Sequence, residues 1–121
     1  MELDKYTLKH KYTVQESREL MEYLVQEALA EWQIYNIDAS DDNYMTEGDM
    51  KDSIEYIIKK ICLQMTDNIR DILSVGFPMG TEEEIIESIK NKAKIVVLNY
   101  TIQQNKPQEH YEVLQNINAF N

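Results

Sequence analysis

The clearest helix start in the chain is Thr81-Glu82-Glu83-Glu84, and a long amphipathic run, IIESIKNKAKIVVLNYTIQQ, follows it at residues 85–104. Thr81 and Glu84 have the spacing of a capping box, in which two side chains satisfy free backbone N–H groups of the first turn. The three glutamates also lie at the positive end of the helix dipole. We therefore expect a helix at 82–104, with a buried face made of Ile85, Ile86, Ile89, Ala93, Val96, Val97 and Tyr100.

The second half of this run has apolar residues on two faces. Residues 94–102 are rich in β-branched side chains and are also compatible with a buried strand, although the long amphipathic run before them favours a helix. In a helix, Ile95, Leu98 and Ile102 share a second face, separate from the first. We expect this second face to be buried, either by the terminal segments of the same chain or by another subunit.

A helix is also expected at 14–36. Thr13 and Glu16 repeat the capping-box spacing directly before it. Its apolar residues recur at helical spacing and predict one buried face. They are Val14, Met21, Leu24, Val25, Ala28 and Trp32.

A third long helix is expected at 47–74, after a weaker cap formed by Thr46 and Asp49. Gly76 is placed to end it in a left-handed conformation. Tyr56 and Leu63, seven residues apart, form a small second face on this helix. Its predicted buried stripe is Met50, Ile54, Ile57, Ile58, Ile61, Met65, Ile69 and Ile72.

The two ends of the chain carry weaker signals. Pro107 suits the first position of a short helix at 107–118. Residues 1–12 alternate as a strand would, yet they also suit a helical turn. The expected fold is therefore all-α: a single domain, 1–121, built as a small antiparallel bundle of three long helices with a short C-terminal helix. An N-terminal arm precedes the bundle, and its pattern does not decide between a strand and a helical turn.

Charge and cysteine content restrict the classes of function. Asp and Glu number 22 against 12 Lys and Arg, giving a formal net charge of −10. Such a charge repels phosphate backbones and anionic membranes, so we expect no direct nucleic-acid or membrane partner. Cys62 is the only cysteine, which excludes an internal disulfide and fits a reducing compartment. We expect Cys62 to be a buried structural thiol. We also expect the protein to be cytoplasmic, or to lie inside a particle assembled in the cytoplasm.

Catalytic motifs are absent from the sequence. The two histidines, His10 and His110, lack the partners of a metal or nucleophile motif, and no phosphate-binding glycine loop occurs. We therefore expect a non-enzymatic protein with no catalytic residue, cofactor or resident metal.

The acidic loop at 38–49 resembles an EF-hand calcium loop in five of its ligand positions. Asn43 stands where that motif has glycine, and no second loop accompanies it. The alternative reading is a capped acidic turn, because the same residue types form turns and caps. The five positions are Asp38, Ser40, Asp42, Thr46 and Asp49.

These observations favour a helical protein–protein interaction protein. The expected contact residues are the second face of the 82–104 helix together with Tyr56, Leu63, Phe77 and Met79, of which the last two are equally suited to plug the end of the bundle. Abundant Ile, Lys, Asn and Tyr indicate an AT-rich source, which suits a small phage or mobile-element assembly or adaptor subunit. One alternative is an acidic inhibitor that mimics nucleic acid on a basic host protein. Another is a weak calcium- or magnesium-dependent module.

Overall fold

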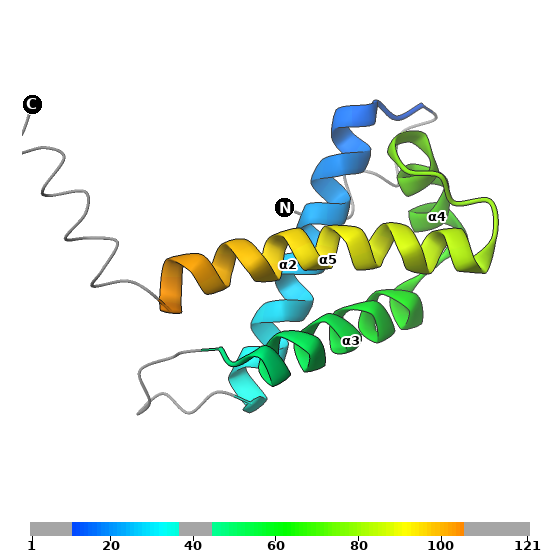
Figure 1. The fold of residues 1–121 in the computed structure, drawn as a ribbon. Helices are drawn as coiled ribbons and strands as arrows, with labels where there is room; N and C mark the ends of the chain where they lie inside the picture. Colours follow the sequence, from blue (N-terminus) through cyan, green and yellow to red (C-terminus); the bar gives the residue numbers. More distant parts are fainter. Residues whose placement is uncertain (1–10, 37–44, 106–121) are drawn as a thin grey trace, which may run out of the picture.

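Four helices make up the described part of the chain, residues 11–36 and 45–105 of a computed structural model (Figure 1). They are α2 (Val14–Asn36), α3 (Glu47–Gln64), α4 (Asp67–Gly76) and α5 (Glu82–Asn105). These ranges contain no strand, so the all-α prediction is confirmed and residues 94–102 are helical. The predicted helix at 107–118 and nearly all of the N-terminal arm lie outside the described residues.

The helices pack as a bundle in which α2 contacts all three of the others. In Figure 1, α3 and α5 lie side by side and run in opposite directions, and their contact is the most extensive among the four described helices. Helix α2 crosses behind this pair, and the short α4 packs against α2. Helix α5 contacts both α3 and α2.

All three predicted helix starts are present. The Thr13 hydroxyl accepts from the Glu16 N–H at 3.0 Å, and the Glu16 carboxylate accepts from the Thr13 N–H at 3.1 Å. Thr46 and Asp49 form the same reciprocal pair before α3, at 3.1 and 3.0 Å. At α5 the Thr81 hydroxyl accepts from the Glu84 N–H at 3.2 Å. These caps were predictable because each depends on residues only three positions apart.

The prediction of one helix at 47–74 is wrong. The chain leaves the helix at Met65, and Thr66 starts α4 by accepting a hydrogen bond from the Ile69 N–H at 3.1 Å. The break lets α3 pack along α5 while α4 turns to bury Ile69, Ile72 and Leu73 against α2. The apolar spacing continues through the break, so periodicity alone does not detect it.

Gly76 has a different role from the predicted one. It is the last residue of α4, its backbone is not left-handed, and Phe77 continues in an extended conformation. A Cβ atom on Gly76 would lie 2.8 Å from the Ser17 hydroxyl oxygen. That hydroxyl is fully buried, donates to the Leu73 carbonyl and accepts from the Gly76 N–H, both at 3.0 Å. The glycine therefore lets the start of α2 approach the end of α4.

The core follows most of the predicted apolar faces, including Trp32 and the inner face of α5. Two predictions are wrong: Val14 is 46% exposed at the start of α2, and Cys62 is exposed on α3 because its neighbour Ile61 takes the inward position. The buried apolar side chains are Leu20, Met21, Leu24, Val25, Ala28, Leu29, Trp32, Met45, Ile57, Ile61, Ile69, Ile72, Leu73, Met79, Ile85, Ile89, Ala93, Val96 and Val97.

Candidate functional site

The second apolar face of α5 is exposed among the described residues. Ile95, Leu98 and Ile102 have 54%, 49% and 53% of their surface accessible. Their spacing of three and four residues puts them on one side of the helix, while Ala93, Val96 and Val97 occupy the core side. We call Ile95, Leu98 and Ile102 the α5 outer face. The terminal segments that the sequence offered as one possible cover lie outside the described residues.

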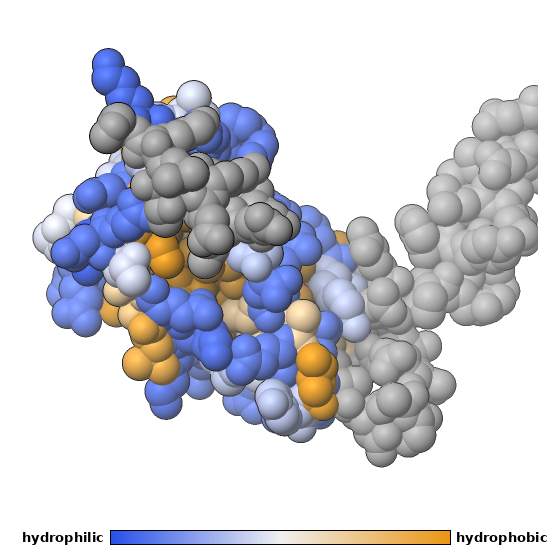
Figure 2. Space-filling view, turned by 180° about the vertical axis from the view of Figure 1, so that it is seen from behind, coloured by the Kyte–Doolittle hydropathy of each residue, from blue (hydrophilic) through white to orange (hydrophobic). Residues whose placement is uncertain are grey.

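Hydrophobic surface elsewhere is more scattered. Figure 2 shows the molecule from behind, where hydrophobic residues emerge as separate areas between hydrophilic ones. Leu63 is 79% exposed on α3, and Ile34 and Tyr35 are exposed at the end of α2. The α5 outer face differs because three large aliphatic side chains follow one another along one helix.

The loop after α4 brings one predicted contact residue to the surface and buries the other. Phe77 is half-buried and packs against the core, whereas Met79 is buried and fills space at the end of the bundle. The Ser88 hydroxyl donates to the Pro78 carbonyl at 3.3 Å and so holds the loop against α5. Phe77 thus has a fixed position beside α5, and Met79 presents almost no surface to a partner.

Tyr56, which the sequence predicts as a contact residue, is hydrogen-bonded within the bundle. Its hydroxyl donates to the Glu31 carboxylate at 2.6 Å, and Lys60 pairs with the same carboxylate at 3.2 Å. The hydrogen bond to Glu31 raises the pKa of Tyr56 to about 12, and the hydrogen bonds from Tyr56 and Lys60 lower the pKa of Glu31. Tyr56 therefore joins α3 to α2. Neither Tyr56 nor Leu63 lines the hollows beside the α5 outer face.

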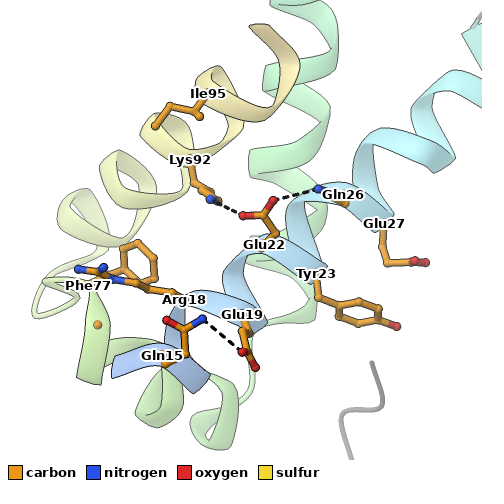
Figure 3. A pocket seen from close by; sticks show the side chains of 11 residues that line it. Gln15, Arg18, Glu19, Glu22, Tyr23, Gln26, Glu27, Phe77, Lys92 and Ile95 are labelled. Carbon is orange, nitrogen blue, oxygen red and sulfur yellow. Dashed lines mark hydrogen bonds and ion pairs between the residues drawn. The ribbon is translucent and has the colours of Figure 1, made fainter. Parts of the chain in front are cut away.

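A groove of about 790 Å³ lies between α2 and α5, next to Ile95 (Figure 3). One wall is a continuous stripe of α2 side chains at helical spacing. The other is formed by Gly76, Phe77, Lys92 and Ile95. In Figure 3, Arg18 extends toward the Phe77 ring. We call this space the α2–α5 groove, and its α2 wall consists of Gln15, Arg18, Glu19, Glu22, Tyr23, Gln26 and Glu27.

An ion pair links the two walls of the α2–α5 groove. The Lys92 ammonium lies 2.5 Å from the Glu22 carboxylate, which also accepts from the Gln26 side chain at 3.0 Å. The hydrogen bond from Lys92 lowers the pKa of Glu22, so this carboxylate stays ionised at neutral pH. The pair neutralises both charges where α2 passes α5.

A second hollow of about 320 Å³ adjoins the first and shares Phe77, Lys92 and Ile95 with it. Its remaining lining residues come from the loop and the first half of α5: Pro78, Glu84, Glu87, Ser88 and Asn91. The sequence analysis predicts Phe77 and Ile95 as contact residues in two separate segments. The structure brings them together where the two hollows meet. The α2 wall was missed, because a polar stripe on an amphipathic helix looks the same whether it borders a groove or faces solvent.

Within residues 11–36 and 45–105, no three His, Cys, Asp or Glu side chains gather as a metal site would require. Most of the 38–49 loop and both histidines lie outside these ranges. Thr46 and Asp49, two of the five expected calcium-ligand positions, are joined in the cap of α3. Although Cys62 is exposed, partial desolvation by its neighbours and the nearby charge of Glu82 raise the pKa of its thiol, the opposite of what an activated nucleophile needs.

No family model matches the chain, and no curated protein or solved structure shows significant similarity to it. Among the described helices, none has the length and apolar content needed to cross a membrane.

Proposed function

We propose that this chain is a non-enzymatic protein-binding module whose contact surface is the α5 outer face, extended at one end by Phe77. The observation that supports this proposal is the exposure of three large aliphatic side chains in a row on a strongly acidic chain. Such a row is an aggregation hazard when it stays in water. A protein partner that covers it removes the hazard and gains binding free energy.

The size of that gain indicates how large the contact must be. Full burial of an aliphatic side chain contributes roughly 1.5–3 kcal/mol. The three side chains are already about half covered, so completing their burial contributes roughly 2–4 kcal/mol. That amount corresponds to millimolar binding or weaker. A specific complex therefore needs more contact than the α5 outer face alone, and the two hollows around Phe77 adjoin it directly.

The finer proposal is a small assembly or adaptor subunit of the kind that phages and mobile elements encode. The AT-rich bias in residue use supports that setting. A net charge of −10 opposes close approach of two copies, so a partner of different charge is favoured over self-association.

Leu98→Asp tests the proposed function, with Leu63→Asp as the matched control on an exposed site away from α5. The full-length variants are tagged and purified from the producing cells, and their mass, co-purifying proteins and melting temperature are compared with those of the wild type. We expect Leu63→Asp to keep the free energy of unfolding within about 0.5 kcal/mol of the wild type, since exposed substitutions cost little. Leu98→Asp should lower it by about 1 kcal/mol, because the Leu98 side chain is half covered. Only Leu98→Asp should lose the bound protein.

One result would contradict the proposal outright. If Leu98→Asp remains a monomer and loses several kcal/mol of stability relative to Leu63→Asp, the face is buried within its own chain, because a charge placed in a buried site is costly.

A further inference from the structure

The two walls of the α2–α5 groove differ in polarity. The α2 wall is polar and charged, and the opposite wall presents Phe77 and Ile95 (Figure 3). From Gln15 to Glu27 the α2 wall covers twelve residue steps, roughly 18 Å of helix. A groove of this length accepts about three turns of a helix laid along it. Its polar and apolar walls suit an occupant with one apolar and one polar face.

Charge around the groove selects the kind of occupant. The Lys92 charge is neutralised by Glu22, which leaves Arg18 as the other cation among the residues lining the two hollows. Four further carboxylates line the same hollows and form no ion pair with another described residue. They come from both sides of Phe77 and Ile95: Glu19, Glu27, Glu84 and Glu87. Lys90 and Lys94 also belong to α5, but they line neither hollow.

We propose that the α2–α5 groove and the adjoining hollow bind a cationic amphipathic helix of a partner protein. The apolar face of this helix packs on Phe77 and Ile95, and its Lys or Arg side chains lie against the carboxylates of the α2 wall and of the adjoining hollow. This inference rests on the proposed function and specifies the chemistry of the partner. Opposite charges at the rim speed association and suppress binding of acidic competitors.

Three labelled peptides test the charge and the shape separately by fluorescence anisotropy on the full-length protein. The first is a fourteen-residue helix-forming Leu/Lys/Ala peptide with leucines at i, i+3, i+4 and i+7 spacing. The second replaces each Lys by Glu, and the third scrambles the first so that the apolar face is lost. We expect the first peptide to bind at least about tenfold more tightly than either of the others.

Attraction between any cationic peptide and a chain of net charge −10 must be separated from binding in the groove. Glu27→Gln with Glu87→Gln removes one carboxylate from the α2 wall of the groove and one from the adjoining hollow. Glu55→Gln with Asp71→Asn removes the same charge from exposed sites on α3 and α4. We expect the groove pair to weaken binding about fivefold more than the control pair. Equal weakening by both pairs would mean attraction by bulk charge and would overturn the inference.

Alanine substitutions test the apolar contact between the peptide and Ile95. Ile95→Ala should weaken binding of the first peptide about fivefold or more, whereas Leu63→Ala should leave it unchanged. Tighter binding of the Glu peptide, or binding of no peptide, overturns the cationic assignment. The comparison of Leu98→Asp with Leu63→Asp does not depend on the charge of the partner. It therefore decides separately whether the proposed protein-binding function also fails.

Discussion

At the scale of single residues, two small side chains determine how α2 meets α4. Ser17 and Gly76 are 59 positions apart in the sequence, yet the buried serine hydroxyl is bonded to the backbone at the end of α4. Neither role could be predicted, because the contact is created only when the helices pack. A serine inside one helix and a glycine at the end of another are both common for local reasons. The sequence therefore does not reveal that these two residues contact each other.

Gly76→Ala should lower the free energy of unfolding by about 1–3 kcal/mol, because the new methyl group would overlap the Ser17 side chain. Gly48→Ala is the control: its Cβ meets only the Thr46 hydroxyl oxygen, at 3.7 Å, in the first turn of α3. That change should be neutral or stabilise by up to about 1 kcal/mol. Urea denaturation of both variants measures the difference, and equal midpoints would refute the close-approach account.

Glu22→Gln should make stability less dependent on pH. The pKa of Glu22 is lowered in the folded protein by Lys92. Its contribution is therefore fully present above the ordinary glutamate pKa and is lost on the acid side of that value, as pH falls through the lowered pKa of the folded protein. The Glu22 side chain is 46% exposed, so the expected loss at pH 7 is only about 0.2–1 kcal/mol.

Thermal melts of Glu22→Gln at pH 7 and pH 3 measure this effect, with Glu27→Gln as a control on the same helix. The wild type and Glu22→Gln should differ at pH 7 and converge at pH 3. A difference that is the same at both pH values would mean that the ion pair with Lys92 contributes nothing.

At the scale of elements, helix starts were predictable and one helix end was not. The caps at Thr13, Thr46 and Thr81 depend on neighbours three residues away, so they can be read from the sequence. The break between α3 and α4 depends on where α5 and α2 lie. Thr66 followed by Asp67 was the local signal, but Met65 and Ile69 continue the apolar spacing and masked it.

Thr66→Ala should destabilise the protein by about 1 kcal/mol, since the first turn of α4 loses its acceptor for the Ile69 N–H. Thr66→Ser keeps the hydroxyl oxygen and should be nearly neutral. Hydrogen exchange at the Ile69 amide should accelerate in the alanine variant alone. Unchanged exchange in both variants would indicate that Thr66 does not cap α4.

At the scale of the whole molecule, the sequence indicated part of the proposed contact surface but not the residues that border it. The second stripe on α5 was visible because its spacing differs from that of the core stripe. Which residues border that stripe depends on helix packing. Phe77 joins Ile95 because Ser88 holds the loop, whereas Tyr56 is occupied by Glu31 and Met79 turns inward.

The central claim is that the α5 outer face contacts another protein, and a photo-reactive residue in place of Leu98 tests it most directly. Illumination of the producing cells should give an adduct of discrete higher mass, whose second component is identified by mass spectrometry. The adduct should disappear when Ile102→Asp is added. The same probe in place of Arg70, exposed on α4, should give none. Two results would contradict the account. One is an adduct that joins position 98 only to residues 1–10 or 106–121 of the same molecule. The other is a yield of adduct at position 98 no higher than that of the control probe at position 70.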